Sequence, residues 1–571
     1  MDNQQIAKVF YTIADLLDIK GENFFKIRAY RMAAQIIETM DTPILQHLKN
    51  GTIEDIKGIG KAVIHKIKEL VETGRLEYLE QLKQEVPEQL LELLTIQGLG
   101  PKKVAALFKE LQITSIDQLQ KAAEQEKIRN LEGFGELTEI KILRGIQLRR
   151  QTSGRYLLHM AYENGIRYLE FMKTCPDLQQ VALAGSLRRM KETIGDIDLL
   201  ASSHNPEKVM SFFVSYPEVD EVLLQGNTKT SVLLHDHIQV DLRVVLPESY
   251  GAALQYFTGS KEHNVSLRSL AIKQGFKLNE YGLFSKDNEQ FIMGDSEENI
   301  YNHLGLDFIE PELRENLGEI QTASTHSLPT LVTQDDIRGD LHVHSTWSDG
   351  ADSLEAMISH AQRLGYEYIA STDHSQSLKI AHGLSEQQVK KKIQAIEKLN
   401  KKHEPFKILV GTECDILADG TLDYPNRILK LFDIVYAGIH TSFSMDGTRM
   451  TKRITDALSN EHVDVLAHPS CRMIGRREPL PIDMAQVIET ARDTGTMLEI
   501  NAFPDRLDLS DYYARQAIEK QVKLVIGTDA HSIHHLPYMI YGVAVARRAW
   551  AETKDIFNTK SLNKLRQVLK V

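Results

Sequence analysis

A repeating strand-then-helix pattern through residues 338–571 constrains the fold more than any other feature of the sequence. Seven short apolar segments with strand character recur there, each followed by a segment of helical period: GDLHVH, YEYIAST, FKILVGTE, FDIVYAGIH, VDVLAHP, TMLEIN and VKLVIGTDAH. Parallel strands joined by crossover helices close into a barrel when enough of them follow in series. We therefore predict a closed or nearly closed parallel barrel of seven strands for this part of the chain.

Histidines and acidic residues occupy the ends of these predicted strands. The C-terminal ends of barrel strands converge on one face, where active sites form. Alternate residues of a strand share a face, so His342 and His344 point together, as do Asp529 and His531. One HVH is commonly structural, but repetition at strand after strand favours a metal site. The predicted ligands are His342, His344, Asp349, His374, Glu413, His440, His468, Asp529 and His531.

The motifs that carry these ligands resemble a known family. DLHVHSTWSDG, STDHS, GTECDI, GIHTS, AHPS and GTDAH are similar to motifs of the polymerase and histidinol phosphatase (PHP) phosphoesterase domain, across roughly residues 338–571. Imidazole with carboxylate suits manganese, zinc or iron better than magnesium, and nine ligands are enough for more than one ion. The resemblance implies a distorted (βα)7 barrel that holds three ions, Mn²⁺, Zn²⁺ or Fe²⁺, on the nine residues and hydrolyses phosphoesters.

A second, carboxylate-only pattern lies upstream, in GSLRRMKETIGDIDLL and HDHIQVDLRVVL. Strand alternation places Asp196 and Asp198 on one face of the first strand and Asp241 on the polar face of the second, with apolar residues behind. This pattern predicts a sheet with helices behind it and an open front. If the two strands are neighbours, three carboxylates crowd together and would hold two Mg²⁺ or Mn²⁺ ions, as in-line phosphoryl transfer requires. Ser186 and Arg189 are natural phosphate receptors. The alternative for GDIDLL alone is an acidic strand end in solvent.

This second pattern resembles the family X DNA polymerases, from the first helix to about residue 317. The resemblance implies that Asp196 and Asp198 bridge both ions and that Asp241 joins the ion that activates the primer 3′-hydroxyl. Lys261 and Gln239 depart from the acid and arginine of vertebrate members, which affects the pocket and the surroundings of Asp241. The implied nucleotide pocket comprises Ser186, Arg189 and Gly195 at the phosphates, Tyr256, Phe257 and Gly259 at the sugar, Asn264 at the base edge and Arg268 at the template.

Residues 1–150 show helical periodicity throughout, with glycine turns between the helices. GIG at 58–60 and GLG at 98–100 each precede a helix and resemble helix-hairpin-helix motifs, which grip DNA phosphates without sequence preference. The resemblance implies DNA contacts at Gly58, Gly60, Gly98, Gly100 and Lys102. The alternative is a glycine helix stop, and the third glycine pair, GFG at 133–135, stays undecided. Net charge is −12, yet residues 1–150 hold 22 basic and 22 acidic residues, so binding there must rely on local geometry.

Lys66 follows the first hairpin and stands where related polymerases have a Schiff-base lysine. Lys26 and Tyr30 resemble the phosphate-binding partners of that lysine. A lysine becomes nucleophilic only when its pKa is depressed, and Ala62 replaces a supporting lysine of many relatives. A 5′-deoxyribose-phosphate lyase and a solvated helix lysine therefore both stay open.

The sequence predicts a multidomain protein of helical, α+β and barrel parts. No apolar run is long enough to span a bilayer, the N-terminus does not resemble a cleaved signal, and three scattered cysteines fit a reducing compartment, so we expect a cytoplasmic protein. The expected divisions are a helical domain with the first hairpin at 1–85, a second helical DNA-binding subdomain at 86–150, a palm at 151–257, a thumb-like subdomain at 258–317, a polar, mobile linker at 318–337 and the PHP domain at 338–571.

These resemblances predict a DNA polymerase that fills short gaps in base excision repair. Its partners would be gapped or primer-template DNA and deoxynucleoside triphosphates. The barrel would act as a 3′→5′ exonuclease, with 3′-phosphatase or abasic-site endonuclease activity as further options. Two other classes stay open: a barrel that is a small-molecule phosphoesterase, and a chain that is a non-catalytic gap-binding scaffold.

Overall fold

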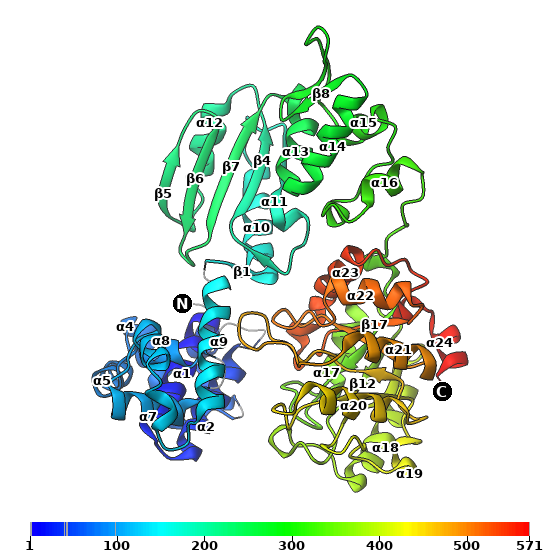
Figure 1. The fold of residues 1–571 in the computed structure, drawn as a ribbon. Coiled ribbons are helices and arrows are strands. Elements are labelled where there is room, and N and C mark those ends of the chain that lie inside the picture. The colour runs from blue at the N-terminus through cyan, green and yellow to red at the C-terminus, as the bar shows by residue number, and fades with distance from the viewer. Residues whose placement is uncertain are drawn as a thin grey trace.

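The computed structural model describes residues 3–38, 40, 44–56, 58–96, 99–152 and 154–569. Three groups of elements are evident in Figure 1: an N-terminal group of helices, a sheet flanked by helices with a small thumb-like region, and a C-terminal barrel. This arrangement confirms the predicted multidomain architecture. Among the described helices, none combines the length and the apolar character that crossing a bilayer demands.

The N-terminal group is entirely helical, as predicted. Its helices are α1 (Asn3–Lys20), α2 (Phe24–Glu38), α3 (Ile44–Asn50), α4 (Lys61–Thr73), α5 (Glu77–Glu85), α6 (Leu90–Leu93), α7 (Pro101–Leu111), α8 (Ile116–Glu124) and α9 (Glu136–Thr152). Apolar residues at helical spacing build one buried core from Ile6 to Ile146. In α4, for example, Ile64 and Ile67 face that core.

The palm is built on a five-stranded sheet of order β2-β4-β7-β6-β5. Its elements are β1 (Tyr156–Leu157), α10 (Leu158–Lys173), β2 (Gln180–Leu183), α11 (Gly185–Arg188), β3 (Thr193–Ile194), β4 (Ile197–Ser202), α12 (Pro206–Phe213), β5 (Val219–Gln225), β6 (Lys229–Leu234), β7 (Gln239–Val245) and α13 (Tyr250–Thr258). Strands β4 and β7 are parallel neighbours, with Asp198 directly opposite Asp241. The largely exposed edge strand β5 was not predicted, because it lacks a buried apolar face.

The front of the palm sheet is not fully open, which corrects the sequence-based expectation. Leu200, on the same face as Asp198, is buried against Tyr250 and Ala253 of α13. On the opposite face, Ile197 and Leu199 enter the main core. Helix α13 therefore covers the front face at Leu200.

The thumb-like region contains a three-stranded antiparallel sheet of order β10-β9-β8. Its elements are α14 (Lys261–Lys273), β8 (Phe276–Asn279), β9 (Gly282–Ser285), β10 (Phe291–Met293) and α15 (Glu297–His303). The predicted linker, residues 318–337, contains regular structure and contacts both neighbouring regions. The segment contains α16 (Glu319–Ser324), whose buried Glu319 lies 2.6 Å from His263 Nδ1. At its far end Val332 N–H donates to Ala551 C=O at 2.9 Å, so bonds fix the segment to both neighbours.

The C-terminal barrel confirms the seven predicted strands, which pair in sequence order and in parallel. The strands are β11 (Gly339–Val343), β12 (Tyr368–Ser371), β13 (Lys407–Asp415), β14 (Ile434–Gly438), β15 (Val465–Leu466), β16 (Met497–Asn501) and β17 (Leu524–Gly527). The helices are α17 (Leu354–Arg363), α18 (Glu386–His403), α19 (Asn426–Leu429), α20 (Gly447–Leu458), α21 (Met484–Thr494), α22 (Asp511–Glu519), α23 (Met539–Arg548) and α24 (Leu562–Val568). One parallel bridge between Val343 and Ala530 joins the first strand to the end of the last.

The palm and the barrel share one continuous hydrophobic core. Tyr162 of α10 packs edge-on against Tyr541 of α23, with ring centroids 6.2 Å apart. An ion pair adds to this contact: Arg472 of the barrel lies 2.7 Å from Glu192 of the palm. The two parts therefore form one packed unit.

Candidate active sites

Asp196, Asp198 and Asp241 come together at the open end of the palm sheet. Each offers a carboxylate oxygen, and these three oxygens lie within 4.8 Å of one another. Parallel pairing of β4 and β7 produces this cluster, since it sets Asp198 opposite Asp241. The start of α11 also approaches closely: a Cβ on Gly185, which has φ +59°, would meet Asp198 Oδ2 at 2.1 Å, so only glycine fits there.

The electrostatic environment of this cluster favours the binding of cations. Burial and the neighbouring carboxylates Asp196 and Asp241 raise the pKa of Asp198 to about 7. Burial alone would raise the pKa of Asp241, but hydrogen bonds from Lys229, Gln239 and Ser231 lower it. Lys229 Nζ lies 2.6 Å from Asp241 Oδ2. Sequence reasoning missed Lys229. It lies on β6 two residues before Ser231, which pairs with Asp241, so strand alternation places Lys229 on the same face as that aspartate.

The predicted phosphate contacts Ser186 and Arg189 belong to the segment that begins at Gly185, the residue that lies against Asp198. Ser186 is in α11, and Arg189 is the residue that ends that helix. The Arg189 guanidinium donates to Glu315 Oε1 at 3.0 Å and to Thr258 C=O at 2.5 Å. Gly259 lies against the same guanidinium, 3.2 Å from the position of an added Cβ. Gly195 directly precedes Asp196 on the way into β4.

The remaining predicted pocket residues lie on α13 and α14. Asn264 is buried, and its amide accepts from Gln255 and donates to Tyr256 C=O, each at 2.7 Å. Arg268 Nε donates to the Asn264 C=O at 3.2 Å. The Phe257 ring lies 4.6 Å from the Arg243 guanidinium. In this structure the Asn264 side chain is thus bonded within the protein.

All nine predicted barrel ligands converge at the C-terminal ends of the strands. The ligand atoms form three overlapping groups, each within 4.8 Å. The groups are His344, Asp349, His374 and His531; His342, His344, Glu413 and Asp529; and His374, Glu413 and His440. His468 joins them through its Nε2, 2.8 Å from Glu413 Oε1. Each of these groups could hold a metal ion.

Supporting carboxylates that sequence reasoning missed fix the orientation of these histidines. Glu499 of β16 lies 2.6 Å from His342 Nδ1 and accepts from the His468 N–H at 2.7 Å. Asp415 of β13 lies 2.5 Å from His440 Nδ1. Such partners orient a metal-binding imidazole and set its tautomer. Glu499 belongs to TMLEIN, the one predicted strand to which no ligand had been assigned. The absence of a ligand from that strand could have drawn attention to its acidic residue.

Negative charge dominates the barrel cluster. Burial would lower the pKa of His344, but hydrogen bonding to Asp529 and Glu413 raises it to about 10. The pKa of His440 rises to about 9 for a similar reason, since Glu413 and Asp415 outweigh its burial. Burial lowers the pKa of His374 to about 3. The surrounding carboxylates thus stabilise positive charge in the cluster, whether it comes from protonated histidines or from metal ions.

The donor set fits divalent metal ions in both places. The buried Nδ1 atoms of His344 and His374 have no hydrogen-bond partner, although a buried imidazole nitrogen ordinarily has one. Imidazole with carboxylate is a borderline donor set that suits Mn²⁺, Zn²⁺ or Fe²⁺, whereas the oxygen-only set of the palm suits Mg²⁺ or Mn²⁺.

The predicted hairpin glycines precede helix N-termini. Gly58 has φ +92°, and a Cβ there would meet Ile36 Cδ1 at 2.5 Å, so the turn requires glycine. Gly60 and Gly100 are the N-cap residues of α4 and α7, both exposed, and Lys102 is exposed in the first turn of α7. Gly98 lies outside the described residues. The undecided third pair has the same geometry, because Gly135 C=O accepts the first hydrogen bonds of α9.

Lys66, Lys26 and Tyr30 gather around Tyr78 of α5, a residue that sequence reasoning missed. The Lys66 and Lys26 amino groups lie 4.7 and 5.6 Å from the centre of the Tyr78 ring, and Tyr30 stacks on it at 6.1 Å. A hydrogen bond to Tyr78 raises the pKa of Lys26. Burial raises the pKa of Tyr30 to about 12.

This fold and its two clusters define a class: a palm with a carboxylate triad packed against a barrel with a histidine-carboxylate cluster. Family models match along the chain: helix-hairpin-helix domain (residues 1–76), SAM-like helix-hairpin-helix tandem (90–148), DNA polymerase beta thumb (253–315) and PHP domain (340–502). The chain belongs to the family X DNA polymerases that carry a PHP domain.

Several relatives support this assignment. The DNA polymerase/3′-5′ exonuclease PolX of Bacillus subtilis is 40% identical over 572 residues, which cover 100% of both chains. A probable phosphatase of Thermoanaerobacter sp. is 30% identical over 243 residues, 40% of this chain and 94% of its own. DNA polymerase lambda of Rattus norvegicus is 23% identical over 349 residues, 55% of this chain and 56% of its own.

Proposed function

We infer that this protein is a DNA-directed DNA polymerase that fills short gaps during base excision repair and that its PHP barrel is a 3′→5′ exonuclease. The observation that carries the inference is the presence of both clusters, each with its full donor set, in one chain aligned end to end with the Bacillus subtilis protein. The substrates would be gapped or primer-template DNA and deoxynucleoside triphosphates. The proposed location is the cytoplasm.

In the proposed polymerase site, the residues of the chain position the reactants. Asp196, Asp198 and Asp241 would hold two Mg²⁺ or Mn²⁺ ions, with Asp241 on the side of the primer 3′-hydroxyl. Arg189 presents a guanidinium to the triphosphate, and Ser186 lies at the N-terminus of the short helix before it. Holding the primer hydroxyl in line with the triphosphate reduces the entropic barrier to phosphoryl transfer.

In the proposed exonuclease site, rigidity comes from the supporting carboxylates. Asp415 and Glu499 fix the imidazoles of His440 and His342. The nine-residue cluster would hold three ions, Mn²⁺, Zn²⁺ or Fe²⁺. Divalent ions, when bound in either cluster, supply Lewis-acid activation of the attacking and leaving oxygens.

A pair of variants tests the proposal on one gapped duplex that carries a labelled primer 3′ terminus. Asp196→Ala should abolish nucleotide incorporation and leave release of the terminal nucleotide intact. His344→Ala should do the reverse. Gap filling that survives Asp196→Ala would refute the polymerase site and favour a gap-binding scaffold.

A second candidate for the barrel is a small-molecule phosphoesterase, since one relative, 30% identical over 40% of this chain, is named a probable phosphatase. The same labelled duplex separates the two candidates. Failure of wild-type protein to release the terminal nucleotide, together with hydrolysis of small phosphomonoesters, would establish the phosphatase alternative. A 3′-phosphate terminus and an internal abasic site, offered in parallel, test the proposed 3′-phosphatase and endonuclease activities.

The helical part is proposed to bind DNA through the exposed helix N-termini at Gly60 and Gly100, with Gly58, Gly98 and Lys102 as neighbouring contacts. For a lyase, Lys66 would be the nucleophile and Lys26 and Tyr30 the phosphate contacts. Trapping of a borohydride-reduced adduct on 5′-deoxyribose-phosphate DNA, lost in Lys66→Ala, tests this option.

A further inference from the structure

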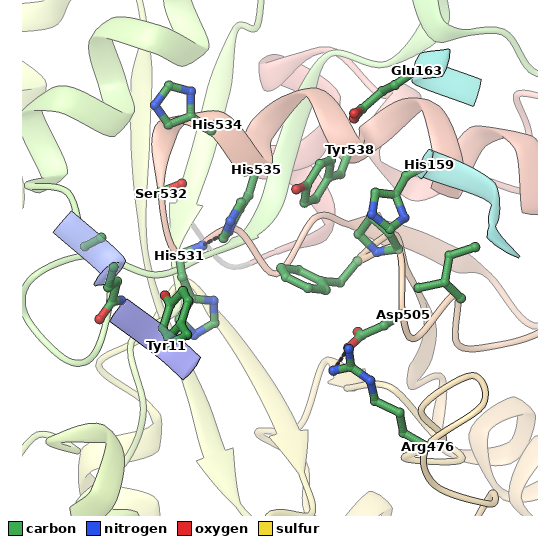
Figure 2. A pocket seen from close by; sticks show the side chains of 15 residues that line it. Tyr11, His159, Glu163, Arg476, Asp505, His531, Ser532, His534, His535 and Tyr538 are labelled. Carbon is green, nitrogen blue, oxygen red and sulfur yellow. Dashed lines mark hydrogen bonds and ion pairs between the residues drawn. The ribbon is translucent and has the colours of Figure 1, made fainter. Parts of the chain in front are cut away.

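A cavity of about 770 Å³ opens beside the barrel cluster, with His531 in its wall. Figure 2 shows the cavity ringed by His535 and Tyr538 of the barrel, Arg476 of a barrel loop and His159 of the palm. A volume of this size falls within the range of small-molecule sites in proteins. The cavity therefore has room for part of a substrate whose scissile bond reaches the cluster.

One wall of the cavity is aromatic. Phe503 lies edge-on to His535 and to Tyr538, with ring centroids 5.2 and 5.5 Å apart, while the rings of His535 and Tyr538 stack on each other at 5.2 Å. All three are partly buried and line the cavity, so ring surface remains available to a ligand. Flat aromatic groups of this kind bind nucleobases by stacking, whatever the base.

The position of this wall is coupled to the candidate metal ligands. The Phe503 N–H donates to Asn501 Oδ1 at 3.0 Å, and Asn501 Nδ2 donates to Asp529 Oδ2 at 3.1 Å. A base stacked on Phe503 would thus be held at a fixed place relative to Asp529. Fixed placement of this kind is what an enzyme needs to bring one particular phosphodiester to its reactive groups.

The rim also carries polar side chains, and some of them come from the polymerase half. Arg476 is exposed and lies 3.7 Å from Asp505, which leaves a cation at the cavity edge where a DNA phosphate can reach it. His159 of α10 has a buried Nδ1 with no hydrogen-bond partner.

We propose that this cavity is the subsite for the base of the 3′-terminal nucleotide, with Phe503 as the stacking face. The proposal rests on the exonuclease function inferred above. It makes Phe503 a substrate-positioning residue outside the metal cluster. It also makes exonuclease recognition dependent on the base as well as on the phosphodiester.

The test compares two single-stranded oligonucleotides that differ only at the 3′ terminus, one ending in an ordinary nucleotide and the other in an abasic tetrahydrofuran residue. With the full-length protein, kcat/KM for terminal release should be about 10-fold or more higher for the base-bearing terminus. Phe503→Ala should remove that preference and leave the abasic rate within about twofold of wild type. Phe503→Tyr, which keeps a stacking ring, should restore it.

Controls separate this proposal from the exonuclease function itself. Tyr512→Ala removes an exposed barrel aromatic outside the cavity lining and should change neither rate. His344→Ala should abolish both. Equal wild-type rates on the two oligonucleotides, or an equal loss on both in Phe503→Ala, would overturn the base subsite while leaving the exonuclease function standing.

Discussion

Arg548, the last residue of α23 in the barrel domain, donates a hydrogen bond of 2.8 Å to the backbone carbonyl of Arg189 in the palm. Its guanidinium also lies 3.1 Å from Glu315 Oε1, the oxygen that accepts from Arg189 Nε at 3.0 Å. One carboxylate is therefore shared between a barrel arginine and the proposed triphosphate-binding arginine.

Arg548→Ala should weaken nucleotide binding by the polymerase. Without Arg548, Glu315 interacts more strongly with Arg189, and Arg189 loses a backbone support. We expect KM for the deoxynucleoside triphosphate to rise about fivefold, the equivalent of roughly 1 kcal/mol of charge-assisted hydrogen bonding, with kcat and terminal release little changed. Steady-state gap filling at varied triphosphate measures this effect.

The matched control for Arg548 is its neighbour. Arg547→Ala breaks an equivalent cross-domain pair, to Glu312 at 2.7 Å, without touching Arg189. A similar rise in KM for both variants would mean that loosened docking, and not the shared carboxylate, is responsible.

Glu499→Gln should reduce metal retention in the barrel. The amide cannot support His342 as a carboxylate does, and loss of such a partner typically costs about 10- to 100-fold in affinity or activity. Metal content after dialysis and terminal release should both fall, while gap filling persists. Glu489→Gln on α21, where the side chain is 56% exposed, supplies a like-for-like comparison. Full metal content in Glu499→Gln would show that Glu499 does not support the site.

Asp198→Asn should have opposite effects with and without metal. The raised pKa of Asp198 means that its ionised form is penalised in the folded state, so at pH 8 without metal the variant should be at least as stable as wild type. Saturating Mg²⁺ should stabilise wild type by about 2.7 kcal/mol at 100 times Kd and the variant much less. Thermal unfolding in EDTA and in Mg²⁺ reads both effects.

A variant at an exposed acid checks that result. Asp220→Asn on β5 removes a charge from a side chain that is 52% exposed, and it should respond to Mg²⁺ as wild type does. If Asp198→Asn also keeps the full Mg²⁺ response, the palm cluster is not the site of binding.

Because of Glu297, the free energy of unfolding should decrease as the pH falls into the acidic range. Burial would raise its pKa, but Arg314 and Arg188 lower it, with Arg314 Nη1 2.5 Å and Arg188 Nη2 2.6 Å from the carboxylate. A depressed pKa contributes stability that is present above the unfolded carboxyl value, about 4.3, and is lost as pH falls below it.

Glu297→Gln should therefore flatten this part of the pH profile and destabilise the protein by about 3–5 kcal/mol at neutral pH, because it leaves buried guanidinium charge unpaired. Urea unfolding between pH 3.5 and 7 measures both. Glu298→Gln, next along α15, serves as the reference, and equal slopes for the two variants would contradict the assignment.

The sequence predicted the catalytic elements better than their supports. Strand alternation was enough to put His342 and His344 on one face and to put Asp198 and Asp241 on the polar faces of their strands, whereas the pairing of β4 with β7 came from the structure. It could not predict the contact of Arg548 with Arg189, 359 positions apart, since no periodic pattern encodes which surfaces of two domains pack together. The role of Tyr78 was not predicted either, because only the packing of α2, α4 and α5 brings it to Lys66.

The continuous apolar core between palm and barrel has a mechanical consequence. Swinging one half away from the other would expose Tyr162, Tyr541 and their neighbours to water, at roughly 25 cal/mol for each Å² uncovered. A primer terminus that is extended at one centre and trimmed at the other must then be carried across a fixed surface. Transfer without such an opening would require the nucleic acid itself to melt and slide between the two centres.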